Sequence, residues 1–427
     1  MSITASNQPP GPADGLPGIS GASGPATAPR GVAVVDVDPF SNEFLADPYP
    51  DHERMREAGQ VIWIPKYGIY ASARHEEVRA ILNDHGTYIS SAGVGLADFN
   101  KETPFRPKSL ILEADPPDHT RARSVLARIL SPKTVMQVRA TFAAEADALL
   151  DRLADKARNE GGFDAVKDLG EVYPLKVFPD AVGLESEGRE MLLLYGNMIF
   201  NAFGPRNELL MRAAEKVKPV TQWIMDHCKR DMLRPGGFGD MIYQAADAGE
   251  ISREEAPLLV RSFLSAGVDT TVNGIGNALL CLARHPEQYS KLHADPTLAR
   301  PAFEEGLRFE SAVQTFFRTT SMDARIAGVT IPEGSKVLTF LAAANRDPRH
   351  WPEPDRFDIE RRPTGHMAFG SGIHGCVGQV VARLEGELIL AGFAKRFKRV
   401  SLAGEPTRRL NNTLRALGSL PLKLELA

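Results

Sequence analysis

The sequence has few cysteines, no surplus of positive charge and no long apolar run. Its three cysteines, Cys228, Cys281 and Cys376, are spread over 427 residues, which argues against a disulfide framework and a zinc knuckle. With 50 Lys and Arg against 54 Asp and Glu, the net charge is -4, and a nucleic-acid binder would usually carry a basic excess. Neither a membrane span nor a signal peptide is visible. We therefore expect a cytoplasmic protein that binds neither nucleic acid nor membrane.

The remaining composition predicts one globular domain behind a short leader. Residues 1–34 are rich in Pro, Gly, Ser and Ala without a periodic pattern, which is typical of a disordered leader. Residues 35–427 show no internal repeat and no second linker, so we expect a single domain there.

Helical periodicity dominates this domain and predicts a mainly α fold with a smaller β portion. Alternation over 61–71 predicts a β-hairpin with its turn near Gly68, and extended runs flank a turn at 331–335. The expected helices cover about 47–57, about ten residues from 75, a segment opening at 115–118, and 132–158, 186–204, 207–231, 253–285, 297–310 and 377–397.

The surroundings of Cys376 are unusual. The stretch Phe369-Gly-Ser-Gly-Ile-His-Gly-Cys-Val-Gly378 places four glycines around one cysteine at the start of a predicted helix. Glycine lets a backbone approach a flat macrocycle closely, and N–H groups of a turn and a helix N-terminus favour a thiolate. A thiolate ligand to haem iron assists O–O cleavage. Taken alone, the short Gly-Cys pattern also fits a Gly-rich loop with a buried cysteine.

The full ten-residue pattern resembles the haem-binding signature of the cytochromes P450. His374 stands where Arg is the commoner basic residue, which makes the charge there depend on pH. The resemblance extends over about residues 40 to 427. It implies the cytochrome P450 fold with haem b as cofactor, Cys376 as the axial iron ligand, and Phe369 and His374 beside the haem.

Two further motifs occur in the order that this family requires. Glu305-Gly-Leu-Arg308 can form an ion pair on one helical face, although such a pair alone is more often a surface salt bridge. In the family a downstream arginine joins this pair, and Arg356 in Trp351-Pro-Glu-Pro-Asp-Arg-Phe357 occupies the matching place. The resemblance gives these three residues a structural role.

The stretch Ala266-Gly-Val-Asp-Thr-Thr271 interrupts a predicted helix with poor helix formers. The Thr270 hydroxyl can bond the Ala266 carbonyl and loosen the helix there. A polar kink in a core helix is the alternative. In the family this stretch lies beside the haem, and an acid–alcohol pair supplies protons during oxygen activation; the resemblance gives these catalytic roles to Asp269 and Thr270.

Four cationic residues are expected around the haem propionates. His119 and Arg123 share one helical face, and the family uses such a pair for a propionate. Arg318, in Phe316-Phe-Arg-Thr-Thr320, resembles another propionate partner, with His374 as the fourth. Several cations around two carboxylates make physical sense.

The substrate is predicted from the residues around the Ala266 groove. The chain looks most like the bacterial P450s that oxidise or demethylate para-substituted benzoates. That resemblance gives carboxylate contacts to Arg106, Ser109, Arg261 and Ser262. It gives ring contacts to Phe200, Phe203, Phe316 and Ala266. Simple core packing is the alternative for each phenylalanine.

The resemblance implies a haem-thiolate monooxygenase that oxidises a small aromatic carboxylate with dioxygen, for example by O-demethylation of 4-methoxybenzoate. Electrons would come from a 2Fe-2S ferredoxin and its NAD(P)H-dependent reductase, as separate proteins, docked on the cysteine side. Three alternatives stay open: a P450 for another small hydrophobic substrate such as a terpene, a peroxide-driven peroxygenase, and a non-catalytic haem-thiolate sensor. The Asp269–Thr270 pair argues against the peroxygenase, and no output domain is visible for a sensor.

Overall fold

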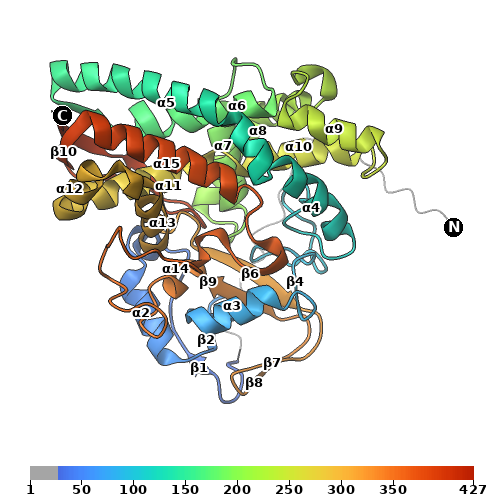
Figure 1. Ribbon diagram of the computed structural model, residues 1–427. Coiled ribbons are helices and arrows are strands. Elements are labelled where there is room, and N and C mark those ends of the chain that lie inside the picture. Colours follow the sequence, from blue (N-terminus) through green and yellow to red (C-terminus); the bar gives the residue numbers. More distant parts are fainter. Residues whose placement is uncertain (1–26) are drawn as a thin grey trace.

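The computed structural model describes residues 27–427, which fold into a helix-rich part and a smaller sheet-rich part (Figure 1). Most of the chain is helical, as the periodicity predicts. The helices are α1 (Asn42–Ala46), α2 (Tyr49–Ala58), α3 (His75–Asn83), α4 (Asp118–Ile129), α5 (Pro132–Glu160), α6 (Val172–Val182), α7 (Met191–Asn201), α8 (Glu208–His227), α9 (Phe238–Asp247), α10 (Glu255–Ala266), α11 (Asp269–Arg284), α12 (Pro286–Ala294), α13 (Ala299–Phe309), α14 (Leu341–Ala344) and α15 (Gln379–Arg396).

The strands form one mixed sheet and three small antiparallel ones. They are β1 (Ala33–Val34), β2 (Ile62–Ile64), β3 (Ile69–Ser72), β4 (Tyr88–Ile89), β5 (Gly162–Asp164), β6 (Thr315–Thr320), β7 (Ala324–Ile326), β8 (Val329–Ile331), β9 (Lys336–Phe340), β10 (Phe397–Leu402), β11 (Thr407–Arg409), β12 (Ala416–Ser419) and β13 (Pro421–Leu426). The mixed sheet has the order β1-β2-β3-β9-β6-β4, and the others are β10-β13-β5, β11-β12 and β7-β8.

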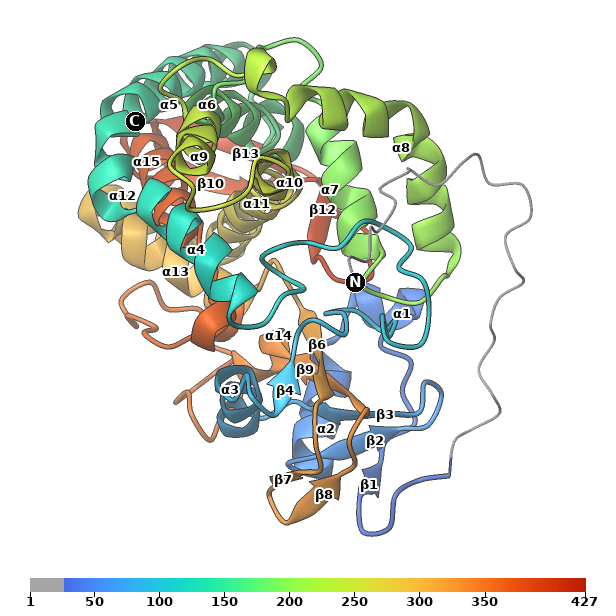
Figure 2. The same cartoon turned by 90° about the vertical axis from the view of Figure 1, so that its right-hand side faces the viewer.

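The two parts meet where the chain returns from the sheet towards α15. Figure 2 shows α5, α6, α9, α10, α11 and α15 gathered in one helical layer, with β6, β9, β3, β2 and β1 in the other part. Nearly every residue of α11 is buried, so this helix forms the centre of the helical core. On β6, Phe316 and Arg318 are two positions apart and therefore face the same way.

Several expectations about the elements need adjustment. The predicted helix over 253–285 is broken, because α10 ends at Ala266 and α11 begins at Asp269. Helix α7 begins at Met191 rather than near 186. At the N-terminus, Ala33 and Val34 pair in parallel with β2, so the predicted leader ends too late. These apolar residues complete a sheet edge that sequence composition does not reveal. Residues 1–26 of the predicted leader lie outside the described residues.

No helix within residues 27–427 is long and apolar enough to cross a membrane. Cys228 and Cys281 are buried among apolar residues, in agreement with a packing role. Cys376 is partly exposed and has a different environment.

Candidate functional site

A large cavity lies between the α10–α11 junction, the Cys376 loop and strand β6. It encloses about 1770 Å³ free of protein atoms, part of it open to solvent. The Thr270 side of the cavity faces the Cys376 side, and a third wall comes from the loop that precedes α4. Predicted site residues that line it are Arg106, Ser109, Arg123, Phe200, Arg261, Ser262, Ala266, Thr270, Phe316, Arg318, Phe369, His374 and Cys376.

The Cys376 loop is held tightly by backbone contacts. The Cys376 N–H donates to the Phe369 carbonyl across 2.8 Å, and Gly378 caps the start of α15. Gly372 has a φ of +68°, and a Cβ there would lie 2.4 Å from the Leu82 carbonyl oxygen, so no other residue fits this turn against α3. The sequence thus folds into a turn that presents one sulfur to the cavity.

The environment of the sulfur has opposing effects on its protonation. Burial raises the pKa of the Cys376 thiol, while the backbone N–H groups of Gly378 and Gln379 and the charges of Arg123 and Arg383 lower it. Donors aimed at a sulfur favour the thiolate, which is the form that binds a metal ion.

Cationic and unpaired polar groups converge on the same cavity. The rings of His119 and His374 lie 4.3 Å apart, and Nε2 of His119 and both ring nitrogens of His374 are buried without a hydrogen-bond partner among residues 27–427. Burial, with the charges of Arg318 and His119, lowers the pKa of His374 to about 3. Buried polar nitrogens usually have a hydrogen-bond partner, so these unpartnered nitrogens beside the cavity fit a site for a polar ligand group.

Among residues 27–427, neither Arg318 nor Arg123 forms a hydrogen bond to a carboxylate, although the charge of Asp115 acts on Arg318. Burial lowers the pKa of Arg318 to about 10, and its Nη1 donates to the Phe317 carbonyl. Arg123 donates to the Gly375 carbonyl across 2.5 Å. The structure therefore brings all four predicted propionate partners together. Among residues 27–427 these side chains have no carboxylate bonded to them, and the propionates of a haem are carboxylates. The donor set fits haem: Cys376 would hold the iron, and these four residues would bind the propionates.

The break between α10 and α11 lies opposite the cysteine. The Thr270 hydroxyl donates to the Ala266 carbonyl across 2.8 Å, as the sequence predicts. A Cβ at Gly267 would lie 2.2 Å from the Phe178 ring, so the helix can approach α6 closely only with glycine here. Ala266 and Thr270 line the cavity at this break.

Asp269 points away from the cavity. Its Oδ1 accepts from Arg409 Nη2 across 2.8 Å and from Asn273 at 3.3 Å. Oδ2 is buried without a partner among residues 27–427. Burial raises the pKa of Asp269, and the charge of Arg409 opposes this rise. No sequence pattern indicated Arg409, which lies on β11, 140 residues away from Asp269 along the chain.

The structural trio needs one correction. Arg308 and Glu305 are fully buried and paired at 2.8 Å, but the third member is Arg361, whose Nε lies 3.2 Å from Glu305 Oε1. The Arg356 side chain is exposed and pairs with Glu353 at 3.0 Å; only its backbone carbonyl joins the network. The turn over 352–361 directs the later arginine inward, which spacing alone does not reveal.

At the other end of the cavity, two arginines have different partners. Arg106 is buried and bonded through both terminal nitrogens to Glu113, at 3.0 and 2.6 Å. Arg261 is also buried and donates to the Lys108 carbonyl at 2.8 Å, with no carboxylate partner in the described part of the chain. The hydroxyl of Ser262 donates to the Leu258 carbonyl, and that of Ser109 accepts from two backbone N–H groups.

The predicted phenylalanines form one cluster. Phe203 lies 5.7 Å from both Phe200 and Phe316, edge to face, and the Arg106 guanidinium lies 4.8 Å above it. Phe200 and Phe316 line the cavity, whereas Phe203 supports them from behind. Glu385 also lines the cavity although it was not predicted from the sequence, and its buried carboxyl has no hydrogen-bond partner among residues 27–427.

Comparisons with known proteins agree with this geometry. The Cytochrome P450 family model matches residues 180–426. The chain is 56% identical to cytochrome p450 CYP199A2 of Rhodopseudomonas palustris over 404 residues, 94% of this chain and 97% of that protein. It is 31% identical to cytochrome P450 107B1 of Saccharopolyspora erythraea over 406 residues, 91% of this chain and 98% of that protein.

Solved structures show the same fold. That of P450BioI in complex with hexadec-9Z-enoic acid ligated acyl carrier protein has a TM-score of 0.79 and 29% identity, over 90% of this chain and all of that one. Epothilone D-bound cytochrome P450epoK has a TM-score of 0.77 and 27% identity, over 92% of this chain. With a cysteine loop, a cationic cluster and a broken helix around one cavity, the chain belongs to the cytochrome P450 family and is a monooxygenase that uses haem b.

Proposed function

We propose that the chain oxidises a para-substituted benzoate, such as 4-methoxybenzoate, and binds its carboxylate at Arg261. The observation that carries this proposal is the state of the two cavity arginines. Glu113 neutralises Arg106, while Arg261 is 5% exposed and has no anionic partner within residues 27–427. A buried guanidinium without a counter-ion favours an anionic ligand. Ser109 and Ser262 lie beside it in the cavity and add polar contacts.

The rest of the cavity suits an aromatic ring. Phe200 and Phe316 line it, Phe203 holds them edge to face, and Ala266 leaves room beside the α10–α11 break. Aromatic side chains bury a ring well in such offset arrangements. With its carboxylate at Arg261, a benzoate would direct its para substituent towards Thr270 and Cys376.

Bound haem b supplies the oxygen activation that a monooxygenase needs. Thr270 Oγ1 lies at the helix break and can pass a proton into the cavity, and Asp269 Oδ2 is the neighbouring acid oxygen that can renew it. For 4-methoxybenzoate, one oxygen atom enters a methyl C–H bond, and the other leaves as water after uptake of two electrons and two protons. The hydroxylated product then releases formaldehyde and 4-hydroxybenzoate.

Electrons would come from a 2Fe-2S ferredoxin and its NAD(P)H-dependent reductase. The side that carries Cys376 offers cations for an acidic partner: Arg79 is exposed on α3, and α3 packs against the cysteine loop, where a Ser371–Asn83 hydrogen bond of 3.1 Å joins them. Charge complementarity of this kind speeds the encounter of redox proteins.

The substrate is tested by spectral titration of the ferric protein with 4-methoxybenzoate and with neutral 4-methoxybenzamide. We expect the acid to shift the ferric iron to its high-spin state. The acid should also bind at least about 30-fold more tightly than the amide, because loss of one member of a buried charge pair costs roughly 2–5 kcal/mol. In Arg261→Met the two ligands should bind alike. Arg212→Met, which removes an exposed α8 cation paired with Glu208, should leave the preference intact. Tighter binding of a neutral terpene than of the acid would overturn the proposal.

A further inference from the structure

A second network of charges lies behind the cysteine loop, on the side away from the substrate. Glu304 of α13 accepts a hydrogen bond from His366 Nε2 at 2.7 Å and a short one from Arg383 Nε of α15. Arg383 Nη1 also donates to Gln379 Oε1 at 2.5 Å. The network therefore joins two helices and the loop that carries the iron ligand.

The protonation states in this network follow from geometry. His366 Nδ1 accepts the Ala368 N–H at 3.2 Å, so the ring donates to Glu304 through Nε2. Burial alone would raise the pKa of Glu304, but hydrogen bonds from His366 and Arg383 outweigh it and lower the pKa to about 2. Glu304 and Arg383 therefore form an ion pair of one anion and one cation.

The cation of this pair faces the cysteine loop. The Arg383 guanidinium lies 4.5 Å from the centre of the Phe369 ring, and the Phe369 carbonyl accepts the Cys376 N–H. The positive charge of Arg383 also acts directly on the Cys376 sulfur, where it favours the thiolate. Arg383 therefore influences the cysteine in two ways: through its contact with Phe369, whose carbonyl bonds the Cys376 N–H, and through its own charge.

We propose that Arg383 is a positioning residue that sets the charge carried by the Cys376 thiolate, and thereby the ferric–ferrous reduction potential of the bound haem, with Glu304 and His366 fixing the guanidinium in place. A cation near the sulfur stabilises the state with more negative charge, which is the reduced one. Glu304 opposes this effect because its charge has the other sign. The two residues therefore tune the potential in opposite directions, although both belong to one structural clamp.

The opposite signs make the inference testable by redox titration of the purified haem protein without substrate. Arg383→Gln should lower the potential, and Glu304→Gln should raise it, each by a threefold to tenfold change in the reduction equilibrium, where tenfold corresponds to ~59 mV. The double variant restores electroneutrality and should return close to the parent potential. Arg396→Gln, which removes a cation from the far end of α15 where it pairs with Asp147 and Asp151, should leave the potential unchanged.

A purely structural clamp gives another pattern. Both single variants would then shift the potential in the same direction, and the double variant would shift it furthest. The carbon monoxide spectrum of the reduced protein would show loss of the thiolate ligand. This pattern overturns the proposal, and so does the absence of any shift in potential. If Arg383→Gln does not retain haem, Arg383→Lys and Glu304→Gln carry the test. Arg383→Lys keeps the positive charge and should keep the parent potential. If Arg383→Lys shifts the potential as much as Glu304→Gln does, the inference is contradicted.

Discussion

Arg409 donates to Asp269 across 2.8 Å and so holds the acid on the side of α11 that faces away from the cavity. Arg409 is 30% exposed at its side chain, whereas Asp269 is fully buried. Glu171 of the neighbouring segment is near both charges, and burial raises its pKa. The acid that neighbours Thr270 is thus connected to the surface by a single cation from the C-terminal part of the chain.

This contact predicts a pH effect for Arg409→Gln. Burial raises the pKa of Asp269 and Arg409 opposes this rise, so loss of the arginine should raise that pKa further. Asp269 then keeps its proton to a higher pH. We expect the pH above which product formed per electron declines to move upward by about the same amount. The Arg396→Gln variant should keep the parent profile, and an unchanged profile in Arg409→Gln would remove Asp269 from proton supply.

Thr270 is expected to control coupling rather than binding. Thr270→Ala removes the hydroxyl that bonds the Ala266 carbonyl, so electron use should continue while a larger share ends as peroxide, with product per electron falling roughly tenfold. Thr270→Ser retains the hydroxyl and should retain most of the coupling. Peroxide and product are measured against NAD(P)H consumed. Equal coupling in the alanine and serine variants would exclude the hydroxyl from proton transfer.

The trio around Glu305 offers a direct comparison of two arginines. Arg361→Ala leaves the buried Glu305 carboxylate with one cation instead of two, and should lower the free energy of unfolding by about 2 kcal/mol. Arg356→Ala removes an exposed pair and should cost at most about 0.5 kcal/mol. Urea unfolding, followed by far-UV circular dichroism and by haem absorbance, measures both. A larger loss in Arg356→Ala would contradict the observed placement of the two side chains.

Residues whose chemistry is carried by a continuous stretch could be predicted from the sequence. The Cys376 loop, the Glu305–Arg308 pair and the Thr270 hydroxyl bond all depend on neighbours within a few positions, where glycine content and helical spacing fix the geometry. The ion pair inside Glu305-Gly-Leu-Arg308 is confirmed at 2.8 Å. Short-range rules also placed the expected helices within a few residues of the observed bounds, since periodicity follows the buried face. Helices α6, α9 and α12 were not predicted from the sequence.

Contacts between distant segments could not be predicted. The direction in which a loop or strand meets the core decides which charged side chain forms such a contact, as for Arg409, Glu113 and Arg361. No local sequence pattern distinguishes these three from other charged residues. The same holds for the broken helix. Poor helix formers at 267–271 predicted a loosened turn, but the full break depends on how closely Phe178 packs against Gly267. Packing, rather than propensity, decided that position.

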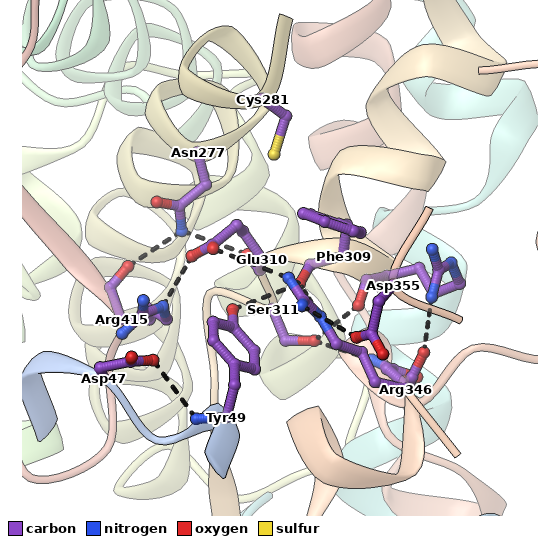
Figure 3. Close-up of polar contacts among 12 residues, drawn as sticks. Asp47, Tyr49, Asn277, Cys281, Phe309, Glu310, Ser311, Arg346, Asp355 and Arg415 are labelled. Carbon is purple, nitrogen blue, oxygen red and sulfur yellow. Dashed lines mark hydrogen bonds and ion pairs between the residues drawn. The ribbon is translucent and has the colours of Figure 1, made fainter. Parts of the chain in front are cut away.

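Glu310 caps the C-terminal end of α13, and Figure 3 shows Arg415 and Arg346 beside it. Its Oε2 accepts from Arg415 at 2.6 Å and from Arg408 at 2.9 Å, and Arg346 lies at 3.8 Å. Arg346 also lies 3.7 Å from the ring centre of Tyr49. This one carboxylate therefore ties the N-terminal α2 and the C-terminal strands to the helical core.

Glu310→Gln should make stability respond differently to acid. Burial alone would raise the pKa of Glu310, but the charges of Arg415, Arg408 and Arg346 outweigh it and lower the pKa to about 2. A carboxyl whose pKa is lower in the folded state stabilises the fold fully above its ordinary value near 4.5, and this contribution disappears as pH falls towards 2. At about pH 7 the variant should therefore be less stable by about 3 kcal/mol, and this gap in the free energy of unfolding should shrink steadily below about pH 4.5. Glu208→Gln, at an exposed pair with Arg212, should differ from the parent by less than about 0.5 kcal/mol in the free energy of unfolding at every pH. If the difference for Glu310→Gln stays constant down to about pH 3, packing rather than charge stabilises this junction.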